Sequence, residues 1–189
     1  MIPDAMIKPL FFFLAGALLL LAETTVPFSL PGGGVPELHY LLVMYLAFQT
    51  TVLLALTVIA PLGLLLDAVS GVLPGYHTAF CTLSFLTIRL LVQRHSWLRG
   101  SSLRLPLLGL NHLLISGLFF LILAYFKPDT MRAWSWLTLP LQALLLVILA
   151  APCFRFFNWI ERFTDAMSFG IRVFSTGNRK QKKTWDSGR

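Results

Sequence analysis

Charged residues are scarce in this chain. Asp, Glu, Lys and Arg make up 12% of its 189 residues, whereas a soluble globular domain has about 25%. Hydrophobic residues account for 57%, and the mean hydropathy is +0.76. These values exclude an ordinary soluble globule and predict a polytopic membrane protein. Lipid offers the backbone no hydrogen bonds, and the long unalternating Leu, Phe and Val runs exclude a barrel, so the predicted fold class is all-α.

Long polar segments are also missing, apart from the tail of residues 175–189. We therefore expect no soluble catalytic module and no enzyme activity. No Gly-rich phosphate-binding loop is present, and the basic tail lacks the interleaved aromatic residues of a nucleic-acid platform. We expect neither a cofactor nor a nucleic-acid partner.

Cysteine and histidine are few and scattered. Cys81 and Cys153 both lie in apolar segments, so neither a disulfide nor the redox compartment can be inferred. The four histidines form no i, i+4 pair and no His-Glu-x-x-His motif, so no metal site is predicted. Ser70 and Ser116 could serve as nucleophiles only beside a base, and no spacing indicates one.

Apolar runs predict about six transmembrane helices, since a span needs about 20 mainly apolar residues. They are expected at residues 9–29, 36–49, 52–70, 76–93, 105–126 and 133–157. The second is short, so it could be tilted, could thin the bilayer or could be partly re-entrant. We divide the chain into a transmembrane domain (1–157), an amphipathic cytoplasmic helix (158–175) and a basic cytoplasmic tail (176–189).

Lys and Arg concentrate in cytoplasmic loops, which allows the orientation to be predicted. With six spans, all but two of the 15 Lys and Arg residues fall on one side, and the two exceptions are Lys127 and Arg132. Both termini are therefore predicted to be cytoplasmic. Five basic residues are expected to face lipid headgroups: Arg94, Arg99, Arg104, Arg155 and Arg162.

The segment after Pro152 has polar and apolar residues on different helical faces. With the basic tail behind it, this segment could lie on an anionic leaflet or could dock a protein.

The densest break in the apolar sequence is the stretch of residues 61–77, which contains Asp67. Asp67 is four residues before Gly71, about 6 Å from the predicted outer end of its helix. His112 is expected closer to the opposite membrane face, so Asp67 and His112 should not pair. Expected partners of Asp67 are Ser70, His77, Lys127 or free backbone N–H groups in the break from Gly71 to Gly75, in a structural lock.

Three polar residues are predicted to form interhelical hydrogen bonds: Asn111, His112 and Gln142, with Ser116 beside them. Gly63 and Gly71 are eight residues apart, a small-residue pattern that favours close helix packing.

The stretch Gly63-Leu-Leu-Leu-Asp67-Ala-Val-Ser70-Gly71, followed by Pro74-Gly75-Tyr76-His77, resembles a segment of the rod shape-determining MreD family. The segment Pro36-Glu37-Leu38 and the last span with its basic end are also similar to that family. The resemblance covers about residues 5–163. It identifies a structural and partner-binding motif, made of Gly63, Asp67, Ser70, Gly71, Pro74 and Gly75.

The resemblance implies a non-enzymatic scaffold of the bacterial rod-elongation machinery in the inner membrane. Implied partners are an MreC-like single-span protein, an actin-like filament and cell-wall synthases that make lateral peptidoglycan. It also implies a fold like the substrate-binding subunits of vitamin transporters. The alternative function is therefore uptake of a vitamin-like small molecule, and an intramembrane hydrolase ranks third.

Overall fold

The computed structural model describes residues 4–25, 37–71, 74–95, 103–126 and 138–186, and within these ranges the side chains of residues 4–6, 123–124, 126 and 168–186 are not described. All regular structure in these ranges is helical, which confirms the predicted all-α class. The helices are α1 (Asp4–Thr25), α2 (Leu38–Gln49), α3 (Val52–Ser70), α4 (Tyr76–Arg94), α5 (Arg104–Phe126) and α6 (Thr138–Asp186).

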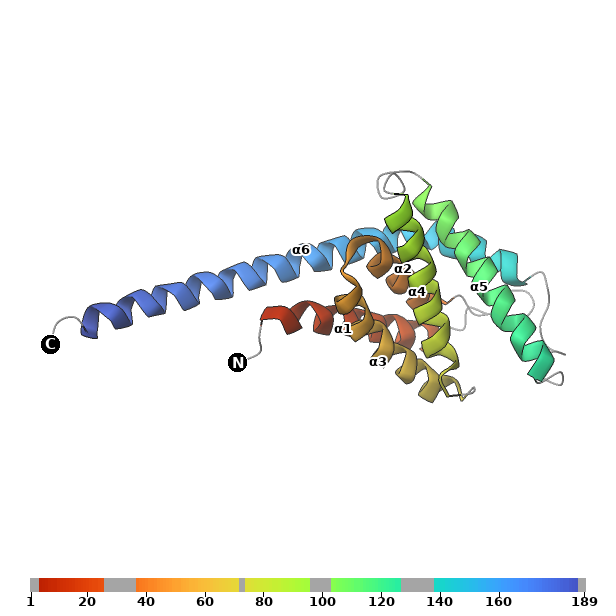
Figure 1. Cartoon of the computed structure of the whole chain (residues 1–189), viewed down its shortest axis with the longest axis horizontal. Coiled ribbons are helices and arrows are strands. Elements are labelled where there is room, and N and C mark those ends of the chain that lie inside the picture. Colours follow the sequence, from red (N-terminus) through yellow and green to blue (C-terminus); the bar gives the residue numbers. More distant parts are fainter. Residues whose placement is uncertain (1–3, 26–36, 72–73, 96–102, 127–137, 187–189) are drawn as a thin grey trace.

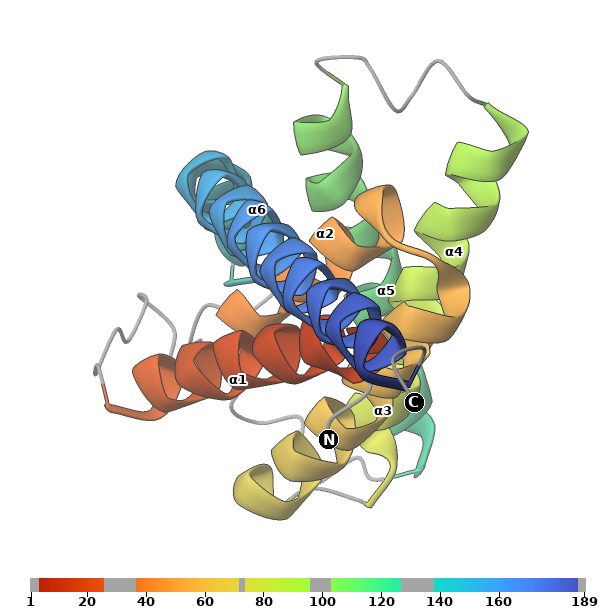
Figure 2. The same cartoon turned by 90° about the vertical axis from the view of Figure 1, so that its left-hand side faces the viewer.

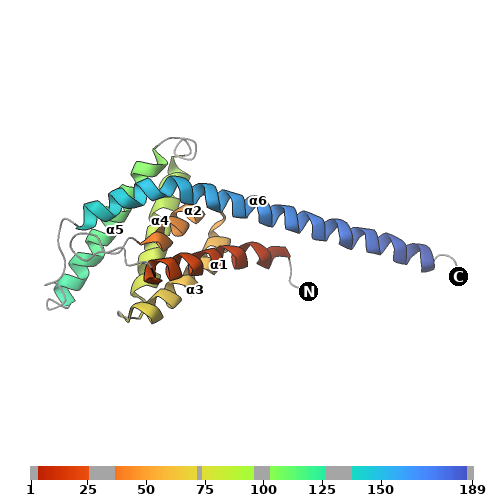
Figure 3. The ribbon, with the colours of Figure 1, turned by 180° about the vertical axis from the view of Figure 1, so that it is seen from behind.

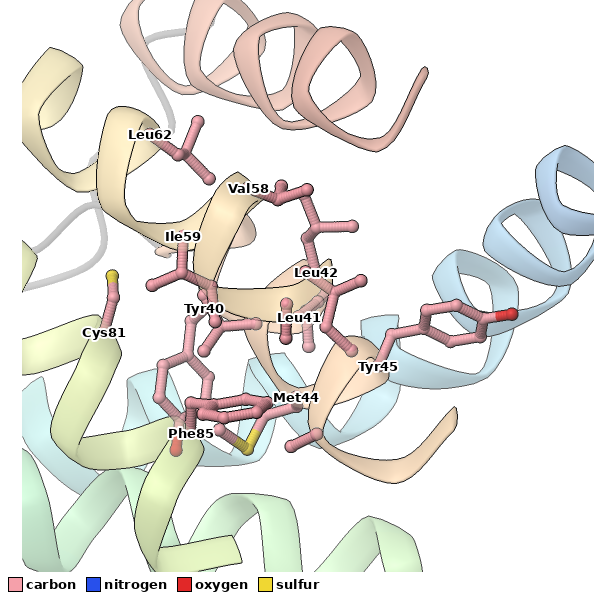
Figure 4. Close-up of a cluster of buried hydrophobic side chains, with 14 of the residues drawn as sticks. Tyr40, Leu41, Leu42, Met44, Tyr45, Val58, Ile59, Leu62, Cys81 and Phe85 are labelled. Atoms are coloured by element: carbon pink, nitrogen blue, oxygen red, sulfur yellow. The ribbon is translucent and has the colours of Figure 1, made fainter. Parts of the chain in front are cut away.

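Helix α2 forms the centre of the bundle. Every residue from His39 to Phe48 is buried, so the helix has no face toward lipid or water. It packs against α1, α3, α4 and α6. Figure 4 shows Ile59 and Leu62 from α3 and Phe85 from α4 around the α2 side chains. A helix that is apolar on all sides requires burial on all sides, which the neighbouring helices provide.

The predicted break at Gln49-Thr50-Thr51 separates α2 from α3. Thr50 and Thr51 both have extended backbone angles, and the Thr50 hydroxyl donates to the Leu46 carbonyl at 2.8 Å. That hydrogen bond satisfies one of the carbonyls left open at a helix end. The chain therefore leaves the helical conformation for two residues before α3 begins.

Among the described residues, four helices contain a segment long and apolar enough to cross a membrane: α1, α3, α5 and the first 30 residues of α6. Helix α2 has 12 residues, about 18 Å, which is shorter than the hydrocarbon core of about 30 Å. Helix α4 has 19 residues but is not among the four. The described part of the chain is thus all-helical with four candidate spans, and a six-span arrangement stays a prediction.

The bundle has two ends, defined here by contacts between helices. At the basic end, the last turn of α2 contacts Arg89 near the end of α4 and Arg104 at the start of α5. Lys8 of α1 forms an ion pair with Asp165 of α6 at 2.6 Å at the same end. The turn between α3 and α4 lies at the opposite end, called here the clasp end (Figure 1).

Helix α6 is one continuous helix of 49 residues with Pro152 inside it. Figure 1 shows it running along the bundle and then projecting well beyond it. Figure 2 looks along α6 and shows α1 crossing beside it, and Figure 3 shows the two helices from behind. The predicted boundaries at residues 157 and 175 therefore fall inside a helix, without a break in the backbone.

Candidate functional site

The carboxylate of Asp67 joins α3 to the start of α4. Its Oδ1 accepts the backbone N–H of His77 at 2.7 Å, and its Oδ2 accepts the backbone N–H of Gly75 at 2.9 Å. Oδ2 also accepts the Thr78 hydroxyl at 2.9 Å, and the His77 Nδ1 lies 3.1 Å from Oδ1. We call these four residues the Asp67 clasp. Both carboxylate oxygens are thus bound by groups at the N-terminus of α4.

The clasp follows from the helix termini around it. The first N–H groups of a helix have no partner within the helix, and the helix dipole favours a negative charge there. Helix α4 has no acidic residue in its first turn, so Asp67 of the preceding helix supplies the charge. The prediction that Asp67 pairs with the break and with His77 is confirmed by these hydrogen bonds. Lys127 lies outside the described residues.

Two glycines shape the turn inside the clasp. Gly71 ends α3 at φ 63° and Gly75 precedes α4 at φ 89°, both in the left-handed region that glycine adopts readily. Ser70, Pro74 and both glycines are exposed at the clasp end. The turn is therefore an accessible surface fixed from beneath by Asp67.

Gly63 provides the close helix contact that its spacing predicted. A Cβ built on Gly63 would lie 2.6 Å from the Thr78 Cα, so α3 and α4 touch backbone to backbone one turn below Asp67. The same prediction was wrong for Gly71, because a Cβ there would meet nothing within 4 Å. Gly71 is needed for its backbone angle and not for packing.

The pair Glu23 and His39 repeats the geometry of Asp67 and His77. A Glu23 oxygen near the end of α1 accepts the His39 backbone N–H at 2.6 Å, and His39 Nδ1 lies 3.1 Å from both carboxylate oxygens. Each histidine is the second residue of its helix. Pro36-x-x-His39 and Pro74-x-x-His77 share one spacing, and this repeated signal was missed in the sequence.

The predicted interhelical polar residues lie inside the bundle. The amide of Asn111 donates to the Tyr40 hydroxyl at 2.7 Å and contacts the Ser84 carbonyl at 3.4 Å. His112 Nε2 lies 3.4 Å from Glu37 Oε2 and 3.4 Å from the Ser116 hydroxyl. Gln142 is buried on α6. Asn111 and His112 therefore link α5 to α2 and to the residue before it.

Aromatic rings surround this polar group. Tyr40 and Phe80 pack against the His112 ring at centroid distances of 5.0 and 6.3 Å. Phe119 packs edge-on against Phe80 at 5.5 Å and against Tyr76 at 5.2 Å. Glu37 and His112 thus lie beside a continuous set of rings from three helices.

A second polar group joins α2 to α6 at the basic end. The Tyr45 hydroxyl lies within hydrogen-bonding distance of two acceptors, Glu161 Oε2 at 2.6 Å and Asn158 Oδ1 at 2.9 Å. Sequence reasoning missed this group, since Tyr45 lies in a uniformly apolar run and its partners are more than a hundred residues away. No local pattern connects them.

The predicted lipid-facing basic residues occupy different environments. Arg94, Arg155 and Arg162 are exposed, whereas Arg104 is half-buried with its guanidinium 5.9 Å from the Phe48 ring centre. Arg99 lies outside the described residues. One face of α6 is apolar and exposed, and it consists of Phe156, Trp159, Phe163 and Met167.

Ser70 lies beside His77 of the Asp67 clasp, which brings a serine, a histidine and an aspartate together, but their geometry differs from a hydrolytic triad. A triad places the nucleophile on one ring nitrogen and the carboxylate on the other. Here Ser70 Oγ at 3.3 Å and Asp67 Oδ1 at 3.1 Å both lie beside Nδ1 of His77. The histidine cannot pass a proton from Ser70 toward Asp67 across its ring in this arrangement.

No group of three or more potential metal ligands occurs in the part of the chain that the structure describes. Comparison of the chain with protein-family models, with curated proteins and with solved structures found no match in any of the three.

Proposed function

We propose that this chain is a non-enzymatic membrane scaffold that resembles the MreD family and organises the bacterial rod-elongation machinery. The segment of residues 63–77 carries the proposal. Its residues match the pattern on which the resemblance rests, and they build a clasp with Asp67 beneath and exposed backbone above. A surface held in one conformation by buried contacts suits partner recognition, because binding then orders little chain.

The proposed partner at the clasp end and the lateral helix faces is an MreC-like single-span membrane protein. The basic end would face the cytoplasm, near an actin-like filament and cell-wall synthases. The uneven distribution of Lys and Arg supports this orientation. The protein would then lie in the bacterial inner membrane with both termini in the cytoplasm.

Co-purification tests the proposal. Tagged wild-type protein, extracted in mild detergent from a rod-shaped bacterium, should recover an MreC-like protein, and Asp67→Ala should recover several-fold less at equal abundance. Arg162→Gln, an exposed change at the basic end, should leave this recovery unchanged. Absence of any elongation partner from the wild-type sample would contradict the proposal.

Uptake of a vitamin-like molecule is the second candidate. The observation that favours it is the set of rings around Glu37 and His112, because ligand sites combine aromatic walls with a few polar groups. Native mass spectrometry of the purified protein distinguishes the two functions. A retained small molecule that is lost in Glu37→Gln would favour uptake over the scaffold.

A further inference from the structure

Arg89 is a half-buried charged residue of α4 with few partners among the described residues. It lies five residues before the end of α4, about 7.5 Å along the helix from Arg94. Its Nη1 donates to the Ala47 carbonyl at 3.2 Å, while its Nε is buried without a hydrogen-bond partner among the described residues. A guanidinium has five N–H donors, so one carbonyl leaves most of them unused.

Arg104 approaches the same turn of α2 from the other side. It is the first residue of α5, its guanidinium lies 5.9 Å from the ring centre of Phe48, and its Nε is also buried without a described partner. Ala47 and Phe48 are consecutive, so both guanidinium groups lie against one turn of α2. The last turn of α2 therefore contacts one arginine of α4 and one of α5.

No carboxylate lies within ion-pair distance of Arg89 or Arg104 in the described ranges. The carbonyls at the end of α2 stabilise part of this positive charge, since a helix C-terminus favours a cation. They do not account for the buried Nε atoms of both arginines, because a buried polar group is costly unless it is hydrogen-bonded. The two side chains have more N–H donors than the described residues have acceptors for them.

The surroundings favour an anion between the two side chains. Helix α5 begins at Arg104 with no acidic residue in its first turn, so its dipole adds to the positive field. The planar guanidinium fork matches the oxygens of a phosphate, which it can bind with two parallel hydrogen bonds. A phosphate is also the anion present at high density where a membrane helix reaches the bilayer surface.

We infer that Arg89 and Arg104 bind the phosphate of one anionic phospholipid at the basic end of the bundle. The lipid headgroup would lie between the end of α4 and the start of α5, with its phosphate oxygens on the unpartnered donors. This inference does not depend on the proposed scaffold function, because it concerns the chain alone.

Native mass spectrometry of the delipidated full-length protein, titrated with dioleoylphosphatidylglycerol, tests the site. The wild type should keep one lipid about tenfold more tightly than any further copy, and more tightly than dioleoylphosphatidylcholine. Arg104→Gln should remove this first tight copy. Arg94→Gln removes the same charge from an exposed position on α4 and should keep it.

Three results would overturn the inference. Equal retention of the two lipids by the wild type would show that no anion-selective site exists. An equal loss in Arg104→Gln and Arg94→Gln would indicate general attraction by surface charge. Displacement of the tight lipid by millimolar inorganic phosphate would identify a site for free phosphate in place of a headgroup. If Arg104→Gln does not fold, the wild-type titration and the phosphate competition still decide the question.

Discussion

The hydroxyl of Tyr45 lies 2.6 Å from a carboxylate oxygen of Glu161, although 116 positions separate the two residues. This contact joins the central helix α2 to the part of α6 that leaves the bundle. Tyr45→Phe should lower the free energy of unfolding by about 1–2 kcal/mol, because a hydrogen bond to a charged group is lost. Titration with sodium dodecyl sulfate in mixed micelles measures this change.

A double-mutant cycle separates the Tyr45 contact from packing. If the hydroxyl acts through Glu161, Tyr45→Phe should cost clearly less in a Glu161→Gln background than in the wild type. Additive effects would mean that Asn158, the second acceptor, carries the interaction.

The Asp67 clasp should contribute strongly to stability. Asp67→Ala leaves the N–H groups of Gly75 and His77 without their acceptor, so we expect a loss of about 2 kcal/mol, in the upper range for helix caps. Asp67→Asn keeps one acceptor oxygen and should lose less. Asp165→Asn is a suitable control, since its exposed ion pair with Lys8 should contribute less than about 1 kcal/mol. A loss for Asp67→Ala no larger than that of the control would contradict the clasp.

Gly63→Ala should destabilise the protein through a steric clash. The new methyl group would meet the Thr78 backbone at 2.6 Å, so α3 and α4 must separate, which we expect to lower stability by about 1–3 kcal/mol. The matched control is Gly117→Ala in α5, where the added Cβ has nothing within 4 Å and helix propensity improves. Gly63→Ala should therefore have a lower melting temperature than Gly117→Ala. Equal melting temperatures would show that α3 and α4 are packed less closely.

The exposed aromatic face of α6 should lie in the bilayer interface. Trp159 is about 32 Å along α6 from Thr138, close to the thickness of the hydrocarbon core. Its ring stacks on Phe163 at 5.7 Å and is 59% exposed. In a variant that keeps Trp159 as its sole tryptophan, lipids brominated near the headgroup should quench its fluorescence more than lipids brominated near the chain end.

Weak quenching by both lipids would instead support the alternative, in which this face of α6 docks a protein. Arg155 and Arg162, two exposed arginines in the same stretch of α6, favour the lipid surface.

Those features that depend on local sequence were predicted well. The helical class, the break at residues 49–51 and the pairing of Asp67 with the turn follow from hydropathy, turn residues and the distance from a helix end. Gly71 was misjudged because spacing alone cannot distinguish a glycine chosen for packing from one chosen for its positive φ. The spacing of two glycines does not reveal the backbone angle that distinguishes these two roles.

The contacts between distant helices could not be predicted. Tyr45 with Glu161, Asn111 with Tyr40 and His112 with Glu37 depend on which helix faces meet, and that is decided by packing of the whole bundle. Each partner of these pairs looked isolated in its own segment. The second acid–histidine pair, Glu23 and His39, was the exception, because the repeated Pro-x-x-His spacing was present in the sequence.

The burial of α2 on every side constrains how the protein can be made. A 12-residue helix is too short to span the bilayer as an independent unit. Its side chains are covered by the other helices, and not by lipid, once the bundle is complete. Its neighbours come from before and after it in the chain. Maturation must therefore end with closure of α3, α4 and α6 around a segment synthesised earlier, so a ribosome stalled before α6 should expose a half-built protein to membrane proteases.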